Sequence, residues 1–402
     1  MDTTITGIGE FVVAQLRSAG YMESTIGQYE KSIRALTGYA RRQGTSVYAP
    51  ALGAGFASLT TSPRTGRFSV QRRFDYRRLV AVFDSYVTTG RVDLSVRKRG
   101  GGGPQPAGAQ FVALNASWEA AMADRGLAAA TRDAYGRTAR GYLCYLESNG
   151  IFDIDAVDGG TVLAFLASLS PRSAKSSLFW VVSNFRPFLA FTDRSDLVDA
   201  VGLAGARRSH SIVPVLDDDD LRLVLTACAC GVVCARDAAI TLLAVSTGLR
   251  ACDIVELRLS DVDWRGQTIC IVQRKTGNPL TVPLTELLVC RLADYVLRDR
   301  PGTGDDHVFV RGVAPHVRLE GHAAIHRVTT EVFRAAGVAD VKVGTRLLRH
   351  NAASRMLRAA TPLPTISAVL GHASEESTKH YMSIDDDRLL RCVLPVPEGA
   401  RP

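Results

Sequence analysis

The sequence predicts a mainly α-helical chain with one small β-sheet in its C-terminal part. Apolar residues recur at helical spacing through the first two hundred residues and again after Asp217. Two short runs with β-like composition, 268–273 and 280–282, enclose a Thr-Gly-Asn turn signal. Glycine- and proline-rich stretches separate these regions, so we expect all-helical bundles followed by a mixed α/β domain.

Composition excludes several protein classes. The chain has 402 residues, of which 46% are apolar and 22% charged, as in globular proteins of two or three domains. No run approaches the roughly 18 uncharged apolar residues that a membrane span needs, and the first residues do not resemble an export signal. Cys228, Cys230 and Cys234 lack a nearby fourth ligand, so we expect small buried thiols and no metal site.

Two breaks divide the chain. The stretch 100–106 holds four glycines and two prolines, a composition typical of a flexible tether, and 202–214 is small and polar. These breaks predict three segments: a basic helical N-terminal domain at 1–99, a second helical domain at 110–203 and a third domain at 212–402.

The net charge of +8 is confined to the first segment. Residues 1–99 contain 15 basic and 7 acidic side chains, and the rest of the chain is neutral overall. Such a segment typically binds a polyanion, with nucleic acid as the default partner, although a merely solubilising surface is the alternative. Four arginines lie on the predicted helix 74–87 or just before it. They could contact phosphates or simply form a solvated face, and the sequence favours neither role. These arginines are Arg72, Arg73, Arg77 and Arg78.

The first two segments are related by an offset of 106 residues, which predicts an internal duplication. Six identities fall within 25 residues without a gap. They pair Gly20, Thr25, Tyr29, Arg34, Tyr39 and Gly44 with Gly126, Thr131, Tyr135, Arg140, Tyr145 and Gly150. In each copy we expect the threonine to cap a helix, the tyrosines to pack in a core, and a second apolar helix to follow, at 74–87 and 178–191.

The third segment begins with four aspartates at 217–220, which suit the N-terminus of a helix. A second helix is predicted at 236–246 and ends before Thr-Gly-Leu-Arg. Ile254, Leu257 and Leu259 then face a core, and the two strands follow, with Lys275 at the lip of their hairpin turn.

Four blocks in the third segment carry a family resemblance. They are TGLRACDIVELRLSDVDW, QRKTGNPLTVPL, GTRLLRHNAASRML and LGHASEESTKHYM, in that order. Their order and intervals resemble the catalytic domain of the tyrosine recombinases, the phage integrase family. The resemblance implies a mixed α/β catalytic domain at 212–402 and a helical core-binding (SAM-like) domain at 110–203. We expect residues 1–99 to be a further DNA-binding module.

The resemblance also implies a set of site residues, taken over position by position. Arg250 and Arg349 match the two catalytic arginines, and Asp253 matches the acidic residue that helps to hold the first of them. The remaining matches are Lys275 for the hairpin lysine, His372 for the histidine of the Leu-Gly-His turn and Tyr381 for the nucleophile.

One position departs from the family pattern. Arg346 stands where the family has a histidine at the start of its His-x-x-Arg block. An arginine donates hydrogen bonds to a phosphate but does not accept a proton near neutral pH. We therefore expect a charge-stabilising role at Arg346 and no role as a base.

These residue types suit cleavage of a phosphodiester. Two arginines can neutralise charge on the non-bridging oxygens, a tyrosine can attack phosphorus, and a lysine can protonate the leaving 5′-oxygen. His372 could bind the phosphate or accept the tyrosine's proton. The resemblance implies a site-specific recombinase of a mobile element, of integrase or transposase type, that forms a 3′-phosphotyrosyl intermediate. It also implies a tetramer on two double-stranded DNA sites and no metal or nucleotide cofactor. Because the sequence has no membrane span, we expect no membrane partner and a cytoplasmic, nucleoid-associated location.

Three alternatives share parts of this pattern. A type IB topoisomerase has the same chemistry but needs neither a specific site nor partner subunits. A Xer-like resolvase usually lacks an additional N-terminal domain such as 1–99. A non-catalytic DNA-binding relic is suggested only by Arg346. The short amphipathic piece at 388–394 could pack on a neighbouring subunit or on its own domain.

Overall fold

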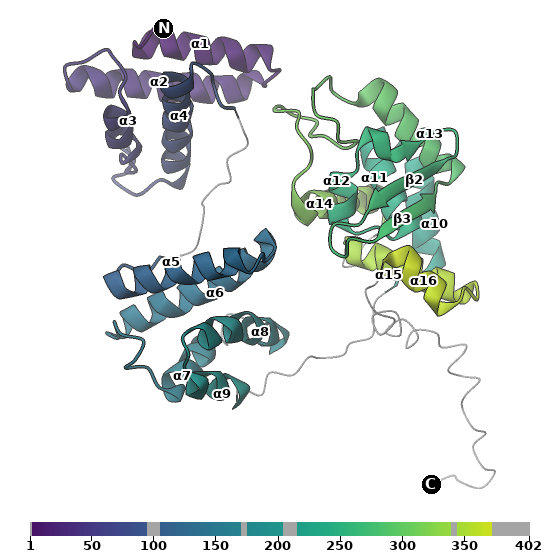
Figure 1. The fold of residues 1–402 in the computed structure, drawn as a ribbon. Helices are drawn as coiled ribbons and strands as arrows, with labels where there is room; N and C mark the ends of the chain where they lie inside the picture. The colour runs from purple at the N-terminus through teal and green to yellow at the C-terminus, as the bar shows by residue number, and fades with distance from the viewer. Residues whose placement is uncertain (1, 95–104, 170–174, 204–214, 339–343, 372–402) are drawn as a thin grey trace. The chain divides into compact units, whose positions relative to one another are not determined.

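The computed structural model describes residues 2–94, 105–169, 175–203, 215–338 and 344–371. In these ranges helices dominate, and a single three-stranded antiparallel sheet lies in the third part of the chain (Figure 1). The predicted fold class is confirmed. No helix within the described ranges is long and apolar enough to cross a membrane. The three parts are described one by one below.

The N-terminal part is a bundle of four helices. They are α1 (Ile5–Ser18), α2 (Glu23–Arg42), α3 (Pro50–Ala57) and α4 (Val70–Thr89). The side chain of Thr4 caps α1 by accepting a hydrogen bond from the backbone of Gly7. Apolar faces of all four helices meet in one core, in which Leu16, Leu36 and Phe83 are fully buried.

Residues 98–211 form a second compact unit with a core of its own. Its helices are α5 (Ala109–Asp124), α6 (Ala129–Ser148), α7 (Gly159–Leu169), α8 (Lys175–Phe191) and α9 (Ser195–Leu203). The core is aromatic: Trp118, Tyr142 and Phe185 are buried, and the rings of Tyr142 and Phe185 meet edge to face at 4.7 Å.

The first two helices of these bundles correspond at the predicted offset. Shifting α2 by 106 residues makes it coincide with α6 at both ends. The turn before each helix also repeats, because Gly20 bonds to Arg17 and Gly126 bonds to Ala123 through the same backbone atoms. Both glycines have positive φ, a conformation that glycine adopts without strain. The two bundles therefore share one helix–turn–helix geometry.

The predicted threonine caps are wrong. The helices begin three residues earlier than predicted, with Met22 and Ala128 at their N-cap positions, so Thr25 and Thr131 lie inside the first turn. The tyrosines do pack in the cores as expected. Tyr29 is buried, and the half-buried Tyr39, Tyr135 and Tyr145 pack against the core clusters of their own bundles.

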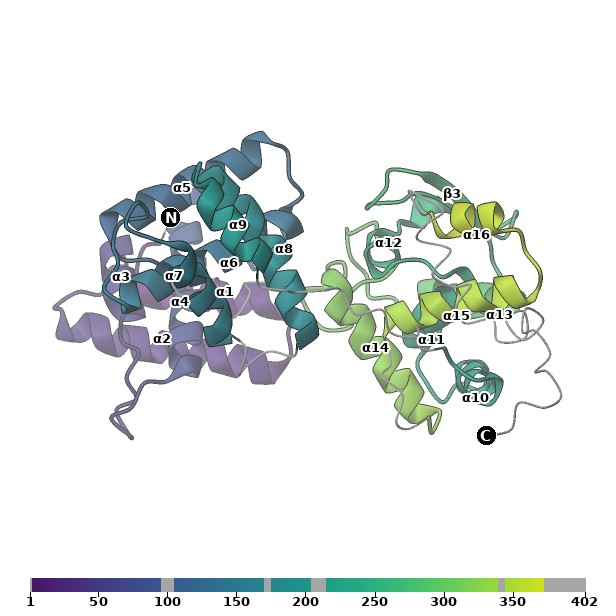
Figure 2. The ribbon, with the colours of Figure 1, turned by 90° about the horizontal axis from the view of Figure 1, so that it is seen from below.

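The third part is built around the buried helix α11 (Ala235–Thr247). Figure 2 shows α11 among its neighbours, which it contacts along its length. These are α10 (Asp218–Ala229), α13 (Glu286–Asp294), α14 (Gly321–Ala335) and α15 (Thr345–Arg358). As predicted, the aspartates begin a helix: the Asp217 side chain caps α10 by accepting a hydrogen bond from the backbone of Asp220.

The remaining elements surround the sheet and the C-terminal end of α11. They are α12 (Ala251–Glu256), η2 (Leu259–Asp261), β1 (Val262–Asp263), β2 (Thr268–Val272), β3 (Pro279–Pro283), η3 (Tyr295–Asp299) and α16 (Leu363–Leu370). The strands pair in the order β1-β2-β3, with Ile269 opposite Val282 on the buried face. Both predicted strands are confirmed within one residue at each end. Ile254 and Leu257 are buried as expected, and Leu259 packs at the edge of the core.

The expectation of three buried thiols is right for one cysteine only. Cys228 is buried, which raises the pKa of its thiol to about 12. Cys230 and Cys234 are exposed, because they lie in the turn between α10 and α11 rather than on a helix face.

Candidate active site

Arg250 occupies the junction between α11 and α12. The chain leaves α11 at Gly248, whose φ of +64° ends the helix, and Arg250 is the N-cap residue of α12. A side chain at Gly248 would crowd Ala352 and Leu370, so only glycine allows α15 and α16 to approach here. The half-buried guanidinium of Arg250 donates to Gln273 Oε1 and to the carbonyl of Gly371, both at 3.0 Å.

Arg349 reaches the same place from α15. Its side chain is buried and donates to the carbonyl of Gly248 at 2.9 Å and to that of Leu370 at 2.6 Å. Both arginines therefore bond to consecutive carbonyls at the C-terminal end of α16, where the helix dipole is negative. The structure brings together the two arginines that the sequence placed a hundred residues apart.

Lys275 lies in the hairpin between β2 and β3, as predicted. The turn is closed by hydrogen bonds from the backbone of Gln273 to Asn278 and from that of Gly277 to Gln273, at 2.9 and 2.8 Å. Gly277 has a φ of +71°, which the turn requires. Lys275 itself is exposed at the tip.

Asp253 is buried on α12, one turn after Arg250. Its Oδ1 accepts a hydrogen bond of 2.9 Å from the backbone of Arg274, the residue before Lys275. Its Oδ2 is buried and has no hydrogen-bond partner among the described residues. The family resemblance implies that Asp253 holds Arg250, whereas the bond found here holds the base of the lysine hairpin.

Arg346 lies on the first turn of α15, three residues before Arg349, and its side chain is exposed. Residues at this spacing lie on the same side of a helix, so Arg346 and Arg349 project from one side of α15. His372, Tyr381 and the piece 388–394 lie outside the described residues. Gly371, the residue before His372, ends the last described helix.

Gln273 is a site residue that the sequence analysis missed. Its side chain is 1% exposed, and its amide bonds to Arg250, to Thr276 and to the carbonyl of Leu370. A glutamine at the end of a short predicted strand, two residues before a hairpin lysine, was the only signal in the sequence. The partners of that amide lie too far along the chain to be read from it.

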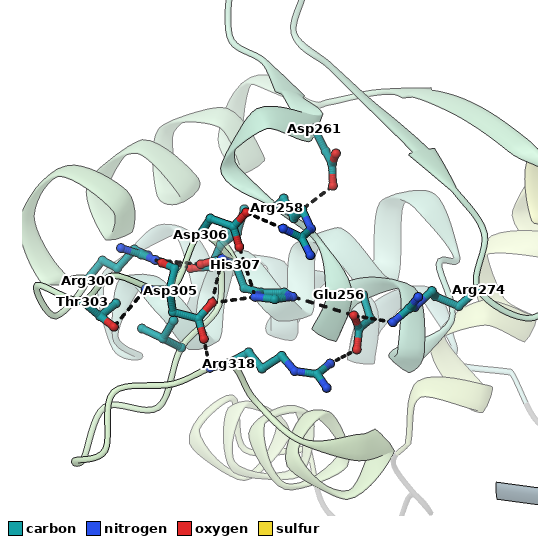
Figure 3. Close-up of polar contacts among 12 residues, drawn as sticks. Glu256, Arg258, Asp261, Arg274, Arg300, Thr303, Asp305, Asp306, His307 and Arg318 are labelled. Atoms are coloured by element: carbon teal, nitrogen blue, oxygen red, sulfur yellow. Dashed lines mark hydrogen bonds and ion pairs between the residues drawn. The ribbon is translucent and has the colours of Figure 1, made fainter. Parts of the chain in front are cut away.

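An ion-pair network holds Arg274, the residue before Lys275, to the end of α12 (Figure 3). Glu256, at the end of α12, pairs with Arg274 at 2.7 Å and also with Arg318. His307 stands 3.7 Å from Glu256 and shares a 2.6 Å contact with Asp305. The network therefore joins α12 and the loop 303–318 to the residue before Lys275.

The acidic end of this network could be mistaken for a metal site. The ligand atoms of Asp305, Asp306 and His307 lie within 4.8 Å of one another. Burial opposes ionisation of Asp305, but hydrogen bonds from His307 and from the backbone of Arg318 outweigh it and lower the pKa of Asp305. Asp306 pairs with Arg258 at 2.5 Å. Because Asp305 is already bonded to His307 and to the backbone of Arg318, and Asp306 is paired with Arg258, we interpret the cluster as a structural network.

The four candidate DNA-binding arginines of α4 have different environments. Arg78 packs over the ring of Tyr29 at 4.3 Å and pairs with the buried Asp75, so it is part of the bundle. Arg72 and Arg73 lie over aromatic rings at 5.2 and 5.3 Å, and only Arg77 is exposed.

Comparisons with known proteins agree with this geometry. The family model described as "Phage integrase family" matches residues 214–388. The integrase/recombinase y4rF of Sinorhizobium fredii is 30% identical over 256 residues, which make up 62% of this chain and 60% of that protein. Tyrosine recombinase XerC of Chromohalobacter salexigens is 30% identical over 266 residues, which make up 64% of this chain and 86% of XerC.

The fold is also that of solved recombinases. The XerH site-specific recombinase, in a post-cleavage complex with its palindromic difH substrate, superposes with a TM-score of 0.56. The match covers 71% of this chain and 90% of XerH at 16% identity. The family match and the relatives agree with the fold, and the chain therefore belongs to the phage integrase family of tyrosine recombinases.

Proposed function

We propose that this chain is a site-specific DNA recombinase of integrase or transposase type, which cuts and rejoins DNA through a 3′-phosphotyrosyl intermediate. The observation that carries the proposal is the convergence of Arg250 and Arg349 on one turn at the end of α16. The hairpin with Lys275 is tied to the same turn through Gln273. Tyrosine recombinases use these residue types together.

The geometry suits transesterification at phosphorus. The two guanidinium groups can stabilise the negative charge that builds on the non-bridging oxygens in the transition state. Tyr381 would attack phosphorus and form the phosphotyrosyl bond, giving its proton to His372 or to solvent, while the bond to the 5′-oxygen breaks. Lys275 would give that leaving oxygen a proton. The reverse reaction with a new 5′-hydroxyl would rejoin the strands.

The proposed partners are double-stranded DNA and further copies of this chain. XerH was solved in a complex with its DNA substrate, and that protein has the same fold. We propose that residues 110–203 clamp the duplex opposite the catalytic domain at 212–402, and that four copies act on two DNA sites. The XerC match covers 64% of this chain. We take the additional segment at 1–99 to favour an integrase over a Xer-like resolvase, which usually lacks such a domain.

Covalent trapping tests this proposal. The full chain is incubated with a library of nicked suicide DNA duplexes, and protein–DNA adducts that survive SDS and heat are sequenced. We expect adducts on a narrow family of sequences, because a recombinase must find its site before it cleaves. Adducts spread evenly over the library would favour a topoisomerase, and the absence of adducts would favour a DNA-binding relic.

Residues 1–99 are proposed to be a second DNA-binding module. They carry the net positive charge of the chain, and their first two helices repeat those of the core-binding bundle at an offset of 106 residues. A tethered second module adds affinity because its binding becomes intramolecular. Deleting residues 1–104 should therefore shorten the DNA footprint and weaken binding by about tenfold to a hundredfold.

The salt dependence of binding provides a second measurement. The deletion should flatten the fall of affinity with salt, because fewer phosphate contacts release fewer counterions. Cleavage of a suicide substrate at high protein concentration should persist.

Within α4, Arg77→Ala should reduce DNA affinity without loss of stability, whereas Arg78→Ala should destabilise the bundle. An unchanged footprint together with lost oligomerisation would assign this segment to protein–protein contact instead.

A further inference from the structure

The amide of Gln273 lies at the centre of the described site without an assigned role. Its Oε1 accepts hydrogen bonds from Arg250 Nη1 at 3.0 Å and from Thr276 Oγ1 at 2.9 Å. Its Nε2 donates to the carbonyl of Leu370 at 3.3 Å. The chain positions joined in this way span the α11–α12 junction, the hairpin and the end of α16.

The orientation of this amide is fixed by its partners. Arg250 and Thr276 offer donors on one side, and the carbonyl of Leu370 offers an acceptor on the other. Turning the amide over would set donor against donor and acceptor against acceptor in a buried place, where unpaired polar groups are costly. A side chain that is 1% exposed and bonded on both sides has little freedom to move.

The turn before His372 is packed directly on the same amide. Gly371 has a φ of +61°, and a methyl group placed on its Cα would overlap the amide of Gln273. Arg250 donates to the carbonyl of this glycine as well as to Gln273. Gln273, Arg250 and the end of α16 thus form one closed set of contacts.

The hairpin lysine is held on both sides of its position in the chain. Before it, Arg274 bonds through its backbone to Asp253 and through its side chain to Glu256, both on α12. After it, Thr276 bonds to Gln273. The side chain of Lys275 is therefore exposed, but the residues before and after Lys275 are both held by hydrogen bonds.

We propose that Gln273 is a positioning residue for strand cleavage, which sets Arg250 and the Lys275 hairpin relative to each other. This inference rests on the proposed function. In this role Gln273 acts through its neighbours and does not touch the DNA. Its loss would misplace both the general acid and one charge-stabilising arginine while leaving the DNA-binding surfaces intact.

The test uses the full chain with Gln273→Met, which keeps the length of the side chain and removes its hydrogen bonds. Single-turnover cleavage is measured on two suicide duplexes, one with the ordinary 5′-oxygen and one with sulfur in its place. Sulfur is a good leaving group without a proton, so it bypasses the general acid. The reference variant Lys275→Ala should lose about 100-fold or more on oxygen and regain it on sulfur.

We expect Gln273→Met to bind DNA within about twofold of the wild type and to cleave the oxygen substrate about 100-fold more slowly. Sulfur should restore only part of this loss, because Arg250 remains misplaced. Thr276→Val removes one bond at a half-buried position, so it serves if Gln273→Met fails to fold. It should give a smaller loss that sulfur restores fully.

Thr329→Val is the matched control, since it removes a buried side-chain hydrogen bond to Ile325 within α14. It should cleave both substrates at the wild-type rate. Gln273→Met or Thr276→Val at the wild-type rate would overturn the inference, as would a loss of equal size on oxygen and sulfur. A wild-type chain that forms no covalent complex would instead overturn the proposed function, and this inference with it.

Discussion

Replacing Tyr381 by phenylalanine is expected to abolish the covalent protein–DNA complex while DNA affinity stays within about twofold of the wild type. The change removes one oxygen atom, the proposed nucleophile, and leaves the ring in place. Since the intermediate is an ester of that oxygen, no neighbouring group can replace it without a new geometry at phosphorus. The expected loss is complete rather than partial.

Two measurements check this expectation. Denaturing gels of trapped suicide substrates should show an adduct for the wild type and none for Tyr381→Phe, and gel-shift titration should show similar binding. Mass spectrometry of the wild-type adduct should locate the nucleotide on the peptide that contains Tyr381. An adduct on any other tyrosine would contradict the assignment.

Tyr295 provides a matched control. It is 1% exposed, its hydroxyl accepts a hydrogen bond of 3.2 Å from the backbone of Val310, and its ring stacks on Phe309. Burial raises the pKa of this hydroxyl, so less of it is ionised at neutral pH, and the buried oxygen cannot reach a phosphate in solution. Tyr295→Phe should therefore cost about 1 kcal/mol of stability and leave cleavage unchanged.

The sequence predicted those features of the fold that depend on neighbouring residues. The end of α11 at Gly248, the cap at Asp217 and the hairpin around Lys275 all follow from local turn and cap chemistry. The threonine caps failed because Gly20 and Gly126 already turn the chain, so each next helix begins before its threonine.

The contacts that assemble the site were beyond sequence analysis. Arg349 bonds to Gly248 across 101 residues, and Gln273 bonds to Leu370 across 97. Hydrophobic periodicity reports which face of an element is buried, but it does not report which distant carbonyl that face meets. The family resemblance could name both arginines, whereas the amide that joins one of them to the hairpin became visible only in the structure.

The two arginines are expected to differ in what their loss does to the protein. Arg250 is half-buried at a helix start, so Arg250→Ala should act mainly on the transition state. Removing one such donor costs about 3–4 kcal/mol, which is a loss of about a hundredfold to a thousandfold in cleavage. The melting temperature should fall by less than in Arg349→Ala, because Arg250 is less buried and Gln273 Oε1 keeps its hydrogen bond from Thr276. Arg250→Lys should recover only part of the activity, because lysine lacks the planar fork of donors.

Arg349→Ala should lose both activity and stability. Its buried guanidinium joins the carbonyls of Gly248 and Leu370, so its removal takes one donor from each of these buried acceptors. Leu370 keeps the 3.3 Å bond from Gln273 Nε2, whereas the carbonyl of Gly248 loses its side-chain donor, at about 1–3 kcal/mol. We therefore expect a thousandfold or greater loss of cleavage together with a lower melting temperature, measured by calorimetry beside Arg250→Ala. Equal melting temperatures for these two variants would contradict the structural role of Arg349.

Variants of Arg346, on the same helix as Arg349, test the role of positive charge without a change in stability. It is exposed one turn before Arg349, so Arg346→Ala should leave the melting temperature unchanged and reduce cleavage by about tenfold or more. Arg346→Lys should keep most of the activity if the position acts only by charge and hydrogen bonding. Full activity in Arg346→Ala would show that this position, which departs from the family histidine, does not belong to the active site. Arg250 and Arg349 would then be the arginines of α12 and α15 that stabilise the charge on the phosphate.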